Sequence, residues 1–238
     1  MAERPVFVPA PETPELVREI YFPFQWSSGF APVQKKKNIS ALHEAAAAAG
    51  YSPLLEISTK SDDKLGRHLS AFHLKVQSSA LGDIPLESAF QGSKVFESGG
   101  PYVDLYSADV RDAKRDPRLR ESGRLVEFKF DGVRFGLEPK TAFYDWLYVT
   151  AIFPHRDWLT RLSRYKGFTD IEFNPERSIN CQARSCALFV ALMHKHVLED
   201  AVGSPEAFVG LIASHEYRPQ FRHADERTPS GLFNSEPS

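Results

Sequence analysis

The sequence predicts an α+β fold: a single, mainly helical domain with a small antiparallel sheet. Alternation of apolar and polar residues, which is typical of strands, is concentrated towards the front of the chain, whereas helical patterns dominate the rest. The 238 residues show no internal repeat and no linker long enough to divide them. The helices and strands are therefore expected to share one core.

Composition and charge exclude several classes of protein. Hydrophobic residues make up 42% of the chain and charged residues 25%, which is close to the globular average and excludes a disordered protein. No apolar run approaches the roughly 20 residues that cross a bilayer. The net charge of −2 excludes a general nucleic-acid coat, so any such contact must be a local patch. Cys181 and Cys186 match no zinc or redox spacing. We expect a cytoplasmic protein with no membrane partner.

The front of the chain carries most of the predicted strands. Residues 1–14, rich in proline and glutamate, are predicted to form an arm over the surface. Alternating segments predict strands at residues 19–26, 54–59 and 69–76. Asn38 is a favourable N-cap for a helix over residues 39–49, which Gly50 ends.

From residue 87 onward the pattern is mainly helical. Helices are predicted over residues 87–96, 109–120, 140–153, 156–165, 186–198 and 205–213. Gly99-Gly100-Pro101 breaks the chain after the first of them, and Pro117 interrupts the second. Residues 125–130 alternate as a strand. The domain is expected to span residues 15–215, followed by a flexible tail over residues 216–238.

Glu87, Gln91 and Lys94 are the first candidates for chemistry. On a helix these residues are spaced i, i+4 and i+7, so they share one face while Phe90 faces the core. A carboxylate in a first helical turn is also favoured by the helix dipole. The stripe by itself is therefore equally typical of a surface helix.

Lys35, Lys36 and Lys37 stand directly before the predicted N-cap. Free backbone amides and ammonium groups at a helix start favour an anion, so a pyrophosphate or a DNA backbone is a candidate ligand. The alternative is a solvated run of charge. Trp146 lies in an aromatic helix that is typical of a core, although one ring opening onto a pocket would stack on a base. Arg184 is a candidate for phosphate binding or for a structural salt bridge.

Two short motifs follow one another at a characteristic spacing. Ser70 and Phe72 form a Ser-x-Phe element, in which Ala71 occupies the middle position. The second element, Glu-x-x-Phe-Gln-x-x-Lys, is formed by Glu87, Phe90, Gln91 and Lys94. Together the two motifs resemble the signature of the NADAR (YbiA-like) family, and the core resemblance covers roughly residues 65–195.

Four blocks in order resemble a narrower group, the NADAR antitoxins encoded beside DarT-type DNA ADP-ribosyltransferase toxins. The blocks are residues 33–39, 87–94, 138–146 and 174–184. One element departs from the wider family, whose members carry Asp-x-x-Trp-Gly in the closing acidic loop. This chain has Glu-Arg-Ser-Ile-Asn over residues 176–180, so Glu176 is the candidate carboxylate and the aromatic residue is absent.

The resemblance implies hydrolysis of the N-glycosidic bond between ADP-ribose and the exocyclic amine of guanine in DNA. Such an activity would reverse the action of a DarT-type toxin, the implied partner. A carboxylate near the ribose carbon stabilises an oxocarbenium-like centre, and Glu87 is the candidate. Lys94 is a candidate acid, phosphate ligand or Schiff-base nucleophile. The alternative is a binding module that holds ADP-ribose or sequesters the toxin without turnover.

The same resemblance suggests which side chains contact the substrate. They are Lys35, Lys36, Lys37, Asn38, Ser70, Phe72, Phe90, Gln91, Trp146, Glu176 and Arg184. The spacing of histidines and carboxylates in the sequence suggests no metal site, and we expect no cofactor.

Overall fold

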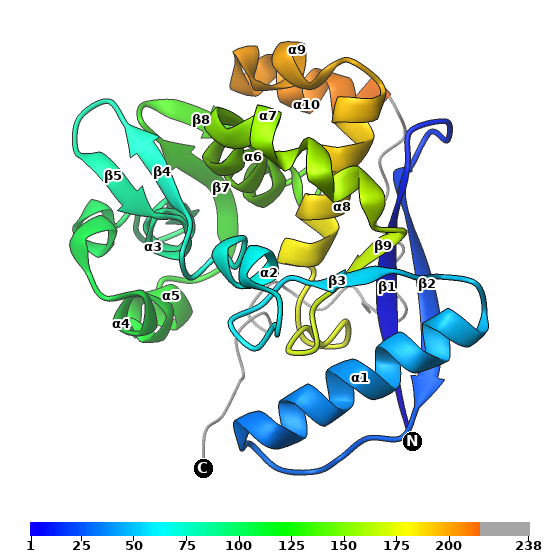
Figure 1. Ribbon diagram of the computed structural model, residues 1–238. Helices are drawn as coiled ribbons and strands as arrows, with labels where there is room; N and C mark the ends of the chain where they lie inside the picture. The colour runs from blue at the N-terminus through cyan, green and yellow to red at the C-terminus, as the bar shows by residue number, and fades with distance from the viewer. Residues whose placement is uncertain (215–238) are drawn as a thin grey trace.

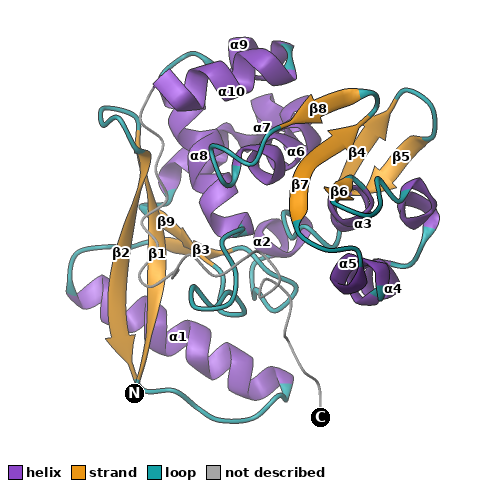
Figure 2. Cartoon of the chain, turned by 180° about the vertical axis from the view of Figure 1, so that it is seen from behind, coloured by secondary structure: helices purple, strands orange, loops and turns teal. Residues whose placement is uncertain are grey.

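Three small sheets and a larger number of helices make up residues 1–214, the part of the chain that the computed structural model describes (Figure 1). The predicted α+β class is confirmed. Figure 2 shows the first sheet and its covering helix on one side and the two smaller sheets on the other, with two central helices between them. The predicted tail over residues 216–238 lies outside the described residues.

The first sheet has the strand order β2-β1-β9-β3. Strand β1 (Ala2–Ala10) pairs along its whole length with β2 (Leu16–Phe24) in an antiparallel hairpin. On its other side β1 contacts β9 (Gly167–Thr169), which in turn pairs in parallel with β3 (Leu54–Glu56). Distant segments of the chain therefore meet in one sheet.

The predicted surface arm over residues 1–14 is wrong, because most of it is strand β1. Val6 and Phe7 are buried on opposite faces of this strand, and they belong to two different apolar clusters. The prolines of the segment suggested an arm. They are tolerated because β9 pairs with β1 only at Phe7, which leaves Pro5 and Pro9 without a ladder partner on that side.

Helix α1 (Pro32–Ala48) covers one face of this sheet and begins earlier than predicted. It begins at a proline, which is favoured at the first helical position. Asn38 is not an N-cap: it is buried inside the helix, where its side chain accepts from the Ser27 amide at 2.7 Å and donates to the Ser27 carbonyl at 3.0 Å. The predicted end is confirmed, because Gly50 follows the helix with a φ of +87°.

A buried polar chain joins α1 to the sheet. His43 Nε2 lies 2.8 Å from Thr169 Oγ1, and that hydroxyl donates to Glu56 Oε2 at 2.6 Å. Since the hydroxyl proton is used by Glu56, the imidazole must be the donor to Thr169. Burial lowers the pKa of His43 to about 4. The folded protein therefore holds this histidine neutral.

This chain of hydrogen bonds predicts a loss of stability in mild acid. Because the pKa of His43 is about 4 in the folded protein and 6.5 otherwise, its contribution is complete above pH 6.5 and is lost as the pH falls towards 4. The expected loss from His43 alone between pH 7.5 and 4.5 is about 2–3 kcal/mol, whereas Asp170, whose pKa is raised to about 8, acts in the opposite direction in both the unchanged protein and the variant below. Urea unfolding at both pH values measures it. His43→Gln keeps a donor and should show a loss smaller by that amount, and equal losses in the two proteins would contradict the assignment.

Two smaller sheets form the other side of the molecule. Strands β4 (Lys75–Ser78) and β5 (Gly82–Pro85) form a hairpin. Strands β6 (Lys94–Phe96), β7 (Leu125–Phe130) and β8 (Val133–Phe135) form an antiparallel meander. The strand predicted over residues 125–130 is thereby confirmed in full.

Two predicted elements in this region are wrong in part. The strand predicted over residues 69–76 is largely a turn, which follows helix α2 (Lys64–His68). The helix predicted over residues 87–96 ends early, because α3 (Leu86–Gly92) stops at a crowded glycine. A Cβ atom at Gly92 would lie 2.6 Å from the ring of Tyr106 and 2.7 Å from a backbone oxygen. The chain turns at this close approach and continues as β6.

The remaining helices are α4 (Val110–Arg115), α5 (Arg118–Glu121), α6 (Ala142–Ile152), α7 (Arg156–Leu159), α8 (Gln182–His194), α9 (Leu198–Gly203) and α10 (Pro205–Ser214), with 3-10 turns η1 (Val103–Ser107), η2 (Phe153–His155) and η3 (Thr160–Arg164). Most of them match the predicted pattern with shifted ends, but α9 was not predicted, and the helix predicted over residues 156–165 is a short α-helix followed by a 3-10 turn. The predicted break at Pro117 separates α4 from α5. None of the helices within residues 1–214 has the length and hydropathy that spanning a bilayer requires.

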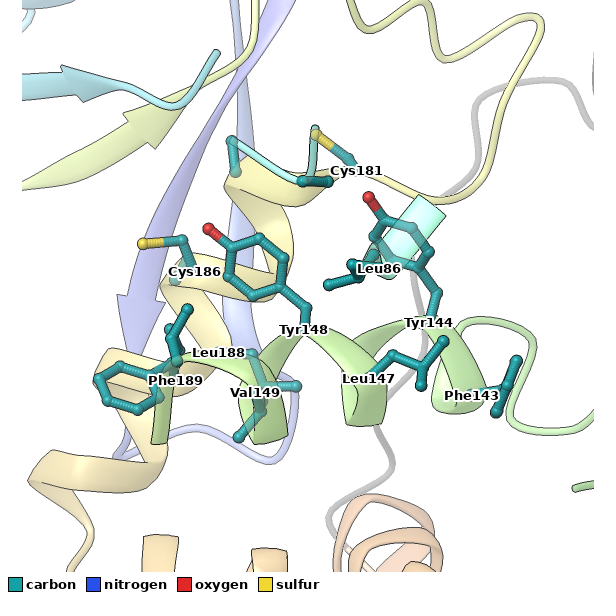
Figure 3. Close-up of a cluster of buried hydrophobic side chains, with 14 of the residues drawn as sticks. Leu86, Phe143, Tyr144, Leu147, Tyr148, Val149, Cys181, Cys186, Leu188 and Phe189 are labelled. Atoms are coloured by element: carbon teal, nitrogen blue, oxygen red, sulfur yellow. The ribbon is translucent and has the colours of Figure 1, made fainter. Parts of the chain in front are cut away.

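Helices α6 and α8 form the centre of the molecule and pack against each other. Both are buried along most of their length, and α8 begins at Gln182, four residues before the predicted start. Figure 3 shows Tyr144 and Tyr148 projecting from α6 on the side that faces α8. The hydroxyl of Tyr144 reaches Glu87 of α3, so the central helix pair connects directly to the first candidate for chemistry.

Candidate active site

The carboxylate of Glu87 is held at the start of α3 by two neighbours. Lys114 Nζ of α4 lies 3.1 Å from Oε2, and the hydroxyl of Tyr144 on α6 donates to Oε1 at 3.3 Å. Glu87 is buried, whereas the side chain of Lys114 is 34% exposed. The buried acid is therefore in contact with a cation that is itself partly exposed to solvent.

Lys94 is the second charged group of this cluster, and only 2% of its surface is exposed. Its ammonium group donates to Gln91 Oε1 at 2.7 Å and lies 4.9 Å from the centre of the Phe90 ring. Burial holds the pKa of Lys94 well below its usual value of 10.5. The charge of Glu87 opposes this shift, and that of Lys114 adds to it. A buried lysine with a low pKa is a competent amine nucleophile.

The structure brings the predicted trio together by a different route. Glu87 and Gln91 lie on α3, as predicted, but Lys94 is the first residue of strand β6. The turn at Gly92 and Ser93 returns the chain so that the Lys94 side chain reaches Gln91. The predicted helical face is therefore wrong, while the grouping of the three side chains stands.

Phe72 lies beside this cluster on the turn that follows α2. Its ring is 41% exposed, and Lys114 Nζ lies 5.1 Å from the ring centre. The same ammonium thus bridges an exposed aromatic face and the carboxylate of Glu87. An exposed ring in this position can stack on a base.

Ser70 is fully buried and supports the turn from inside. Its hydroxyl donates to Gln182 Oε1 at 3.3 Å, and the Ala71 amide donates to the same oxygen at 2.7 Å. Gln182 in turn donates to Asp170 Oδ2 at 2.9 Å. Burial raises the pKa of Asp170 to about 8, and the neighbouring charge of Glu56 adds to the effect. This chain of hydrogen bonds holds the residues that present Phe72.

The aromatic candidates lie mainly in the core. Phe90 is buried and stacks on two other rings, with centroids 5.5 Å from Phe128 and 6.0 Å from Phe143. Trp146 packs on Phe135 with centroids 5.1 Å apart. Phe90 therefore forms the apolar floor under the Lys94 ammonium.

Two buried N–H groups in this region have no hydrogen-bond partner among the described residues. They are Gln91 Nε2 and Trp146 Nε1. Buried donors are almost always paired in folded proteins, with protein, water or ligand. Each of these two donors is therefore available for a hydrogen bond to a ligand or to a water molecule.

Arg184 lies inside α8 in a buried ion-pair network, and does not precede the helix as predicted. Its Nε atom is 3.0 Å from Glu19 Oε1, and Nη1 is 3.5 Å from Asp145 Oδ2. The hydroxyl of Ser185 donates to Asp145 at 2.6 Å. The geometry favours the salt-bridge interpretation over phosphate binding.

The three lysines form the first turns of α1 and do not precede it. Lys35 is half-buried and lies 3.7 Å from Glu172, and Lys36 lies 2.5 Å from Asp62. Lys37 is exposed. The recorded ion pairs therefore join this run to two acidic loops and not to Glu87.

Glu176 lies in the exposed part of the loop after β9. Its backbone amide donates to Asn174 Oδ1 at 3.1 Å, and its charge acts on Arg4 of β1. Asp170 in the same loop is the carboxylate that reaches the turn carrying Phe72, through Gln182. Within residues 1–214, no group of three or more His, Cys, Asp and Glu side chains is placed to hold a metal ion.

Sequence reasoning missed three of these residues. Lys114 belongs to a charged run that suggested only a salt-bridged exterior, and no local pattern distinguishes it from its neighbours. Tyr144 lies in the block over residues 138–146, and its place in that block was the one feature of the sequence that could have indicated a role in the site. Asp170 lies outside the four blocks, and only its hydrogen bond with Gln182 of α8 shows its place in the site.

Comparison with known proteins points to one family. Residues 2–221 match a family described as DarT1-associated NADAR antitoxin, so the match covers most of the chain. No curated protein matches the chain.

Proposed function

Because this chain belongs to the DarT1-associated NADAR antitoxin family and is thus an antitoxin, we propose that it acts as an ADP-ribosyl glycohydrolase. The bond cleaved is the N-glycosidic bond between ADP-ribose and the exocyclic amine of guanine in DNA. Cleavage would restore the base that a DarT-type toxin had modified.

The arrangement around Glu87 is the observation that carries this proposal. A buried carboxylate lies between a partly exposed lysine and a tyrosine, and its charge acts on a second, buried lysine, Lys94. Breaking the bond develops positive charge at the ribose carbon, and a fixed carboxylate in a water-poor site stabilises that charge. The exposed ring of Phe72 would stack on the guanine.

The other contacts of the substrate follow from the same geometry. We assign the ribose hydroxyls to Gln91, because its Nε2 is a buried donor without a partner among the described residues. We assign the proton for the departing amine to Lys114, which is partly exposed and lies 3.1 Å from Glu87. Charge stabilisation, stacking, sugar binding and proton transfer are thereby divided among four side chains.

Lys94 is expected to act as an amine, because burial lowers its pKa. In this role the ribose ring first opens when a proton passes to its ring oxygen, and the ribose carbon stays joined to the guanine nitrogen as an iminium ion. Lys94 adds to that carbon as a neutral amine, and guanine leaves with its exocyclic amine once that nitrogen has gained a proton. The product is a Schiff base between Lys94 and ADP-ribose, which water then hydrolyses to the free amine and ADP-ribose. Each turnover therefore consumes one water molecule and releases one guanine base with its free amine and one ADP-ribose.

Reductive trapping tests this role. Borohydride added during turnover is expected to leave ADP-ribose covalently attached to Lys94, detected by mass spectrometry of the digested protein. Lys94→Arg keeps a positive charge but cannot form a Schiff base, so it should give no adduct. Normal turnover by Lys94→Arg would show that Lys94 acts only as a cation.

The proposed function itself is tested with a purified oligonucleotide ADP-ribosylated on guanine. Incubation with the full chain is expected to release free ADP-ribose, followed by gel shift and by mass. Retention of the modified strand on the protein without release would indicate the non-catalytic binding module. The catalytic proposal would then be wrong.

A further inference from the structure

A cavity of about 820 Å³ lies on the other side of the turn that carries Phe72. It is formed by α2, that turn, β4 with β5, the end of α6, and α7, whose positions can be followed in Figure 1. Its lining is largely apolar, with polar edges that include His68, His73 and His155. None of the residues assigned above to the reaction lines it.

The cavity and the candidate active site are bordered by the same turn. Phe72 contacts Lys114, the partner of Glu87, whereas the next two residues, His73 and Leu74, line the cavity. His73 is held in place by a hydrogen bond of 2.8 Å between its Nδ1 and the Arg67 carbonyl. A ligand bound at Phe72 would reach the cavity by crossing this turn.

Trp158 supplies a flat apolar surface at the cavity edge. Its side chain is 48% exposed, which is unusual for a residue that large. The guanidinium of Arg161 lies 4.0 Å from the centre of the indole. An aromatic ring with an adjoining arginine is the combination that binds an unpaired base and its phosphate.

Two segments that border the cavity have a positive net charge, although the net charge of the whole chain is negative. Residues 60–75 contain four lysines and arginines against two aspartates, and residues 153–166 contain four against one. Together these segments carry a formal charge of +5, although the whole chain carries −2. Within the lining itself, Lys75 and Asp83 pair with each other, so the positive charge lies around the cavity. Clustered positive charge attracts a polyanion and orients it.

We propose that this cavity binds the stretch of single-stranded nucleic acid that flanks the modified guanine, with Trp158 stacking on a base and Arg161 contacting a phosphate. This inference rests on the proposed function, because the strand is the remainder of that substrate. The strand must be unpaired, since a base within a duplex cannot place its face on the indole. The cavity thus selects both the length and the pairing state of the substrate.

Comparing a long with a short substrate tests the proposal. Trp158→Ala is expected to lower kcat/KM about tenfold for a modified single-stranded oligonucleotide. For ADP-ribosylated guanosine, which is too short to reach the cavity, the same variant should leave kcat/KM unchanged. Trp158→Phe retains a ring and should recover most of the loss. An equal loss on both substrates would show a structural effect and overturn the proposal.

A matched pair of arginine variants tests the electrostatic part. Arg161→Gln should weaken binding of the oligonucleotide and reduce the salt dependence by about one released ion. Arg124→Gln removes the same charge from an exposed arginine that pairs with Glu97 outside the cavity. It should have no effect, and equal effects of the two variants would overturn the assignment.

Binding of unmodified strands separates this proposal from the proposed function. If the protein releases no ADP-ribose, fluorescence anisotropy with an unmodified single strand still reports on the cavity, and Trp158→Ala should weaken it. A strand of RNA with the same sequence shows whether the sugar matters. Duplex DNA that binds as tightly as the single strand would contradict the proposal. The proposal would also be contradicted if the Trp158→Ala protein processed oligonucleotides normally but failed to neutralise purified toxin. That result would indicate that the cavity binds a protein partner.

Discussion

Replacing Glu87 by glutamine is expected to lower the rate of ADP-ribose release about a thousand-fold while the modified strand still binds. The amide preserves the shape of the side chain and its hydrogen bond from Tyr144, but it removes the negative charge that faces the ribose carbon. The contact of 3.1 Å with Lys114 also loses its attraction. The loss should therefore appear in kcat, which single-turnover kinetics measures. Binding of the modified strand, measured by fluorescence anisotropy, should be nearly unchanged.

A second glutamate serves as the control for this variant. Glu97 is exposed and pairs with Arg124, so Glu97→Gln should retain full activity. Thermal unfolding of both variants shows whether the fold is intact. Full turnover by Glu87→Gln would exclude this carboxylate from the reaction. If Glu87→Gln loses turnover but still neutralises the toxin in cells, antitoxin action does not depend on hydrolysis.

Replacing Arg184 by methionine is expected to reduce the free energy of unfolding by about 3–5 kcal/mol. The arginine is buried between Glu19 and Asp145, so its removal takes away a positive charge that pairs with two carboxylates in the interior. Burial already raises the pKa of Glu19, and Arg184 opposes that rise. Without Arg184 the pKa rises further, so the loss is greatest at neutral pH and smaller in acid, where Glu19 is protonated.

Urea unfolding of a matched surface variant gives the comparison. Arg124→Met breaks an ion pair whose two side chains are both largely exposed, and the expected change is below about 1 kcal/mol. If Arg184→Met unfolds at the same urea concentration as the unchanged protein yet fails to bind ADP-ribose, then Arg184 contacts the ligand and the structural interpretation is wrong.

Elements with a strong local signal were predictable from the sequence. The alternation over residues 125–130 corresponds to β7 in full, and the aromatic segment of α6 and the stop at Gly50 were also correct. These features depend on neighbours in the chain, where side-chain period and backbone freedom act directly. The grouping of Glu87 with Lys94 was predicted from another signal, the resemblance of the motif to that of a family. Their roles in the reaction remain predictions.

Elements that depend on distant partners were not predictable. Strand β1 contains prolines and is a strand because β2 and β9 flank it. Asn38 is typical of a helix start, yet it lies inside α1 because Ser27, eleven residues earlier, satisfies its side chain. Such pairings are decided by packing, which overrides local preference.

The sequence by itself determined the class of the fold, the family, and the residue types available for chemistry. Only the tertiary structure decided which of them meet. The crowded backbone at Gly92 ends α3 early and turns Lys94 back towards Gln91, and the packing of α4 brings Lys114 to Glu87. Periodicity along one chain contains no information about such contacts, because they are formed by segments whose distance in sequence is unrelated to their distance in space.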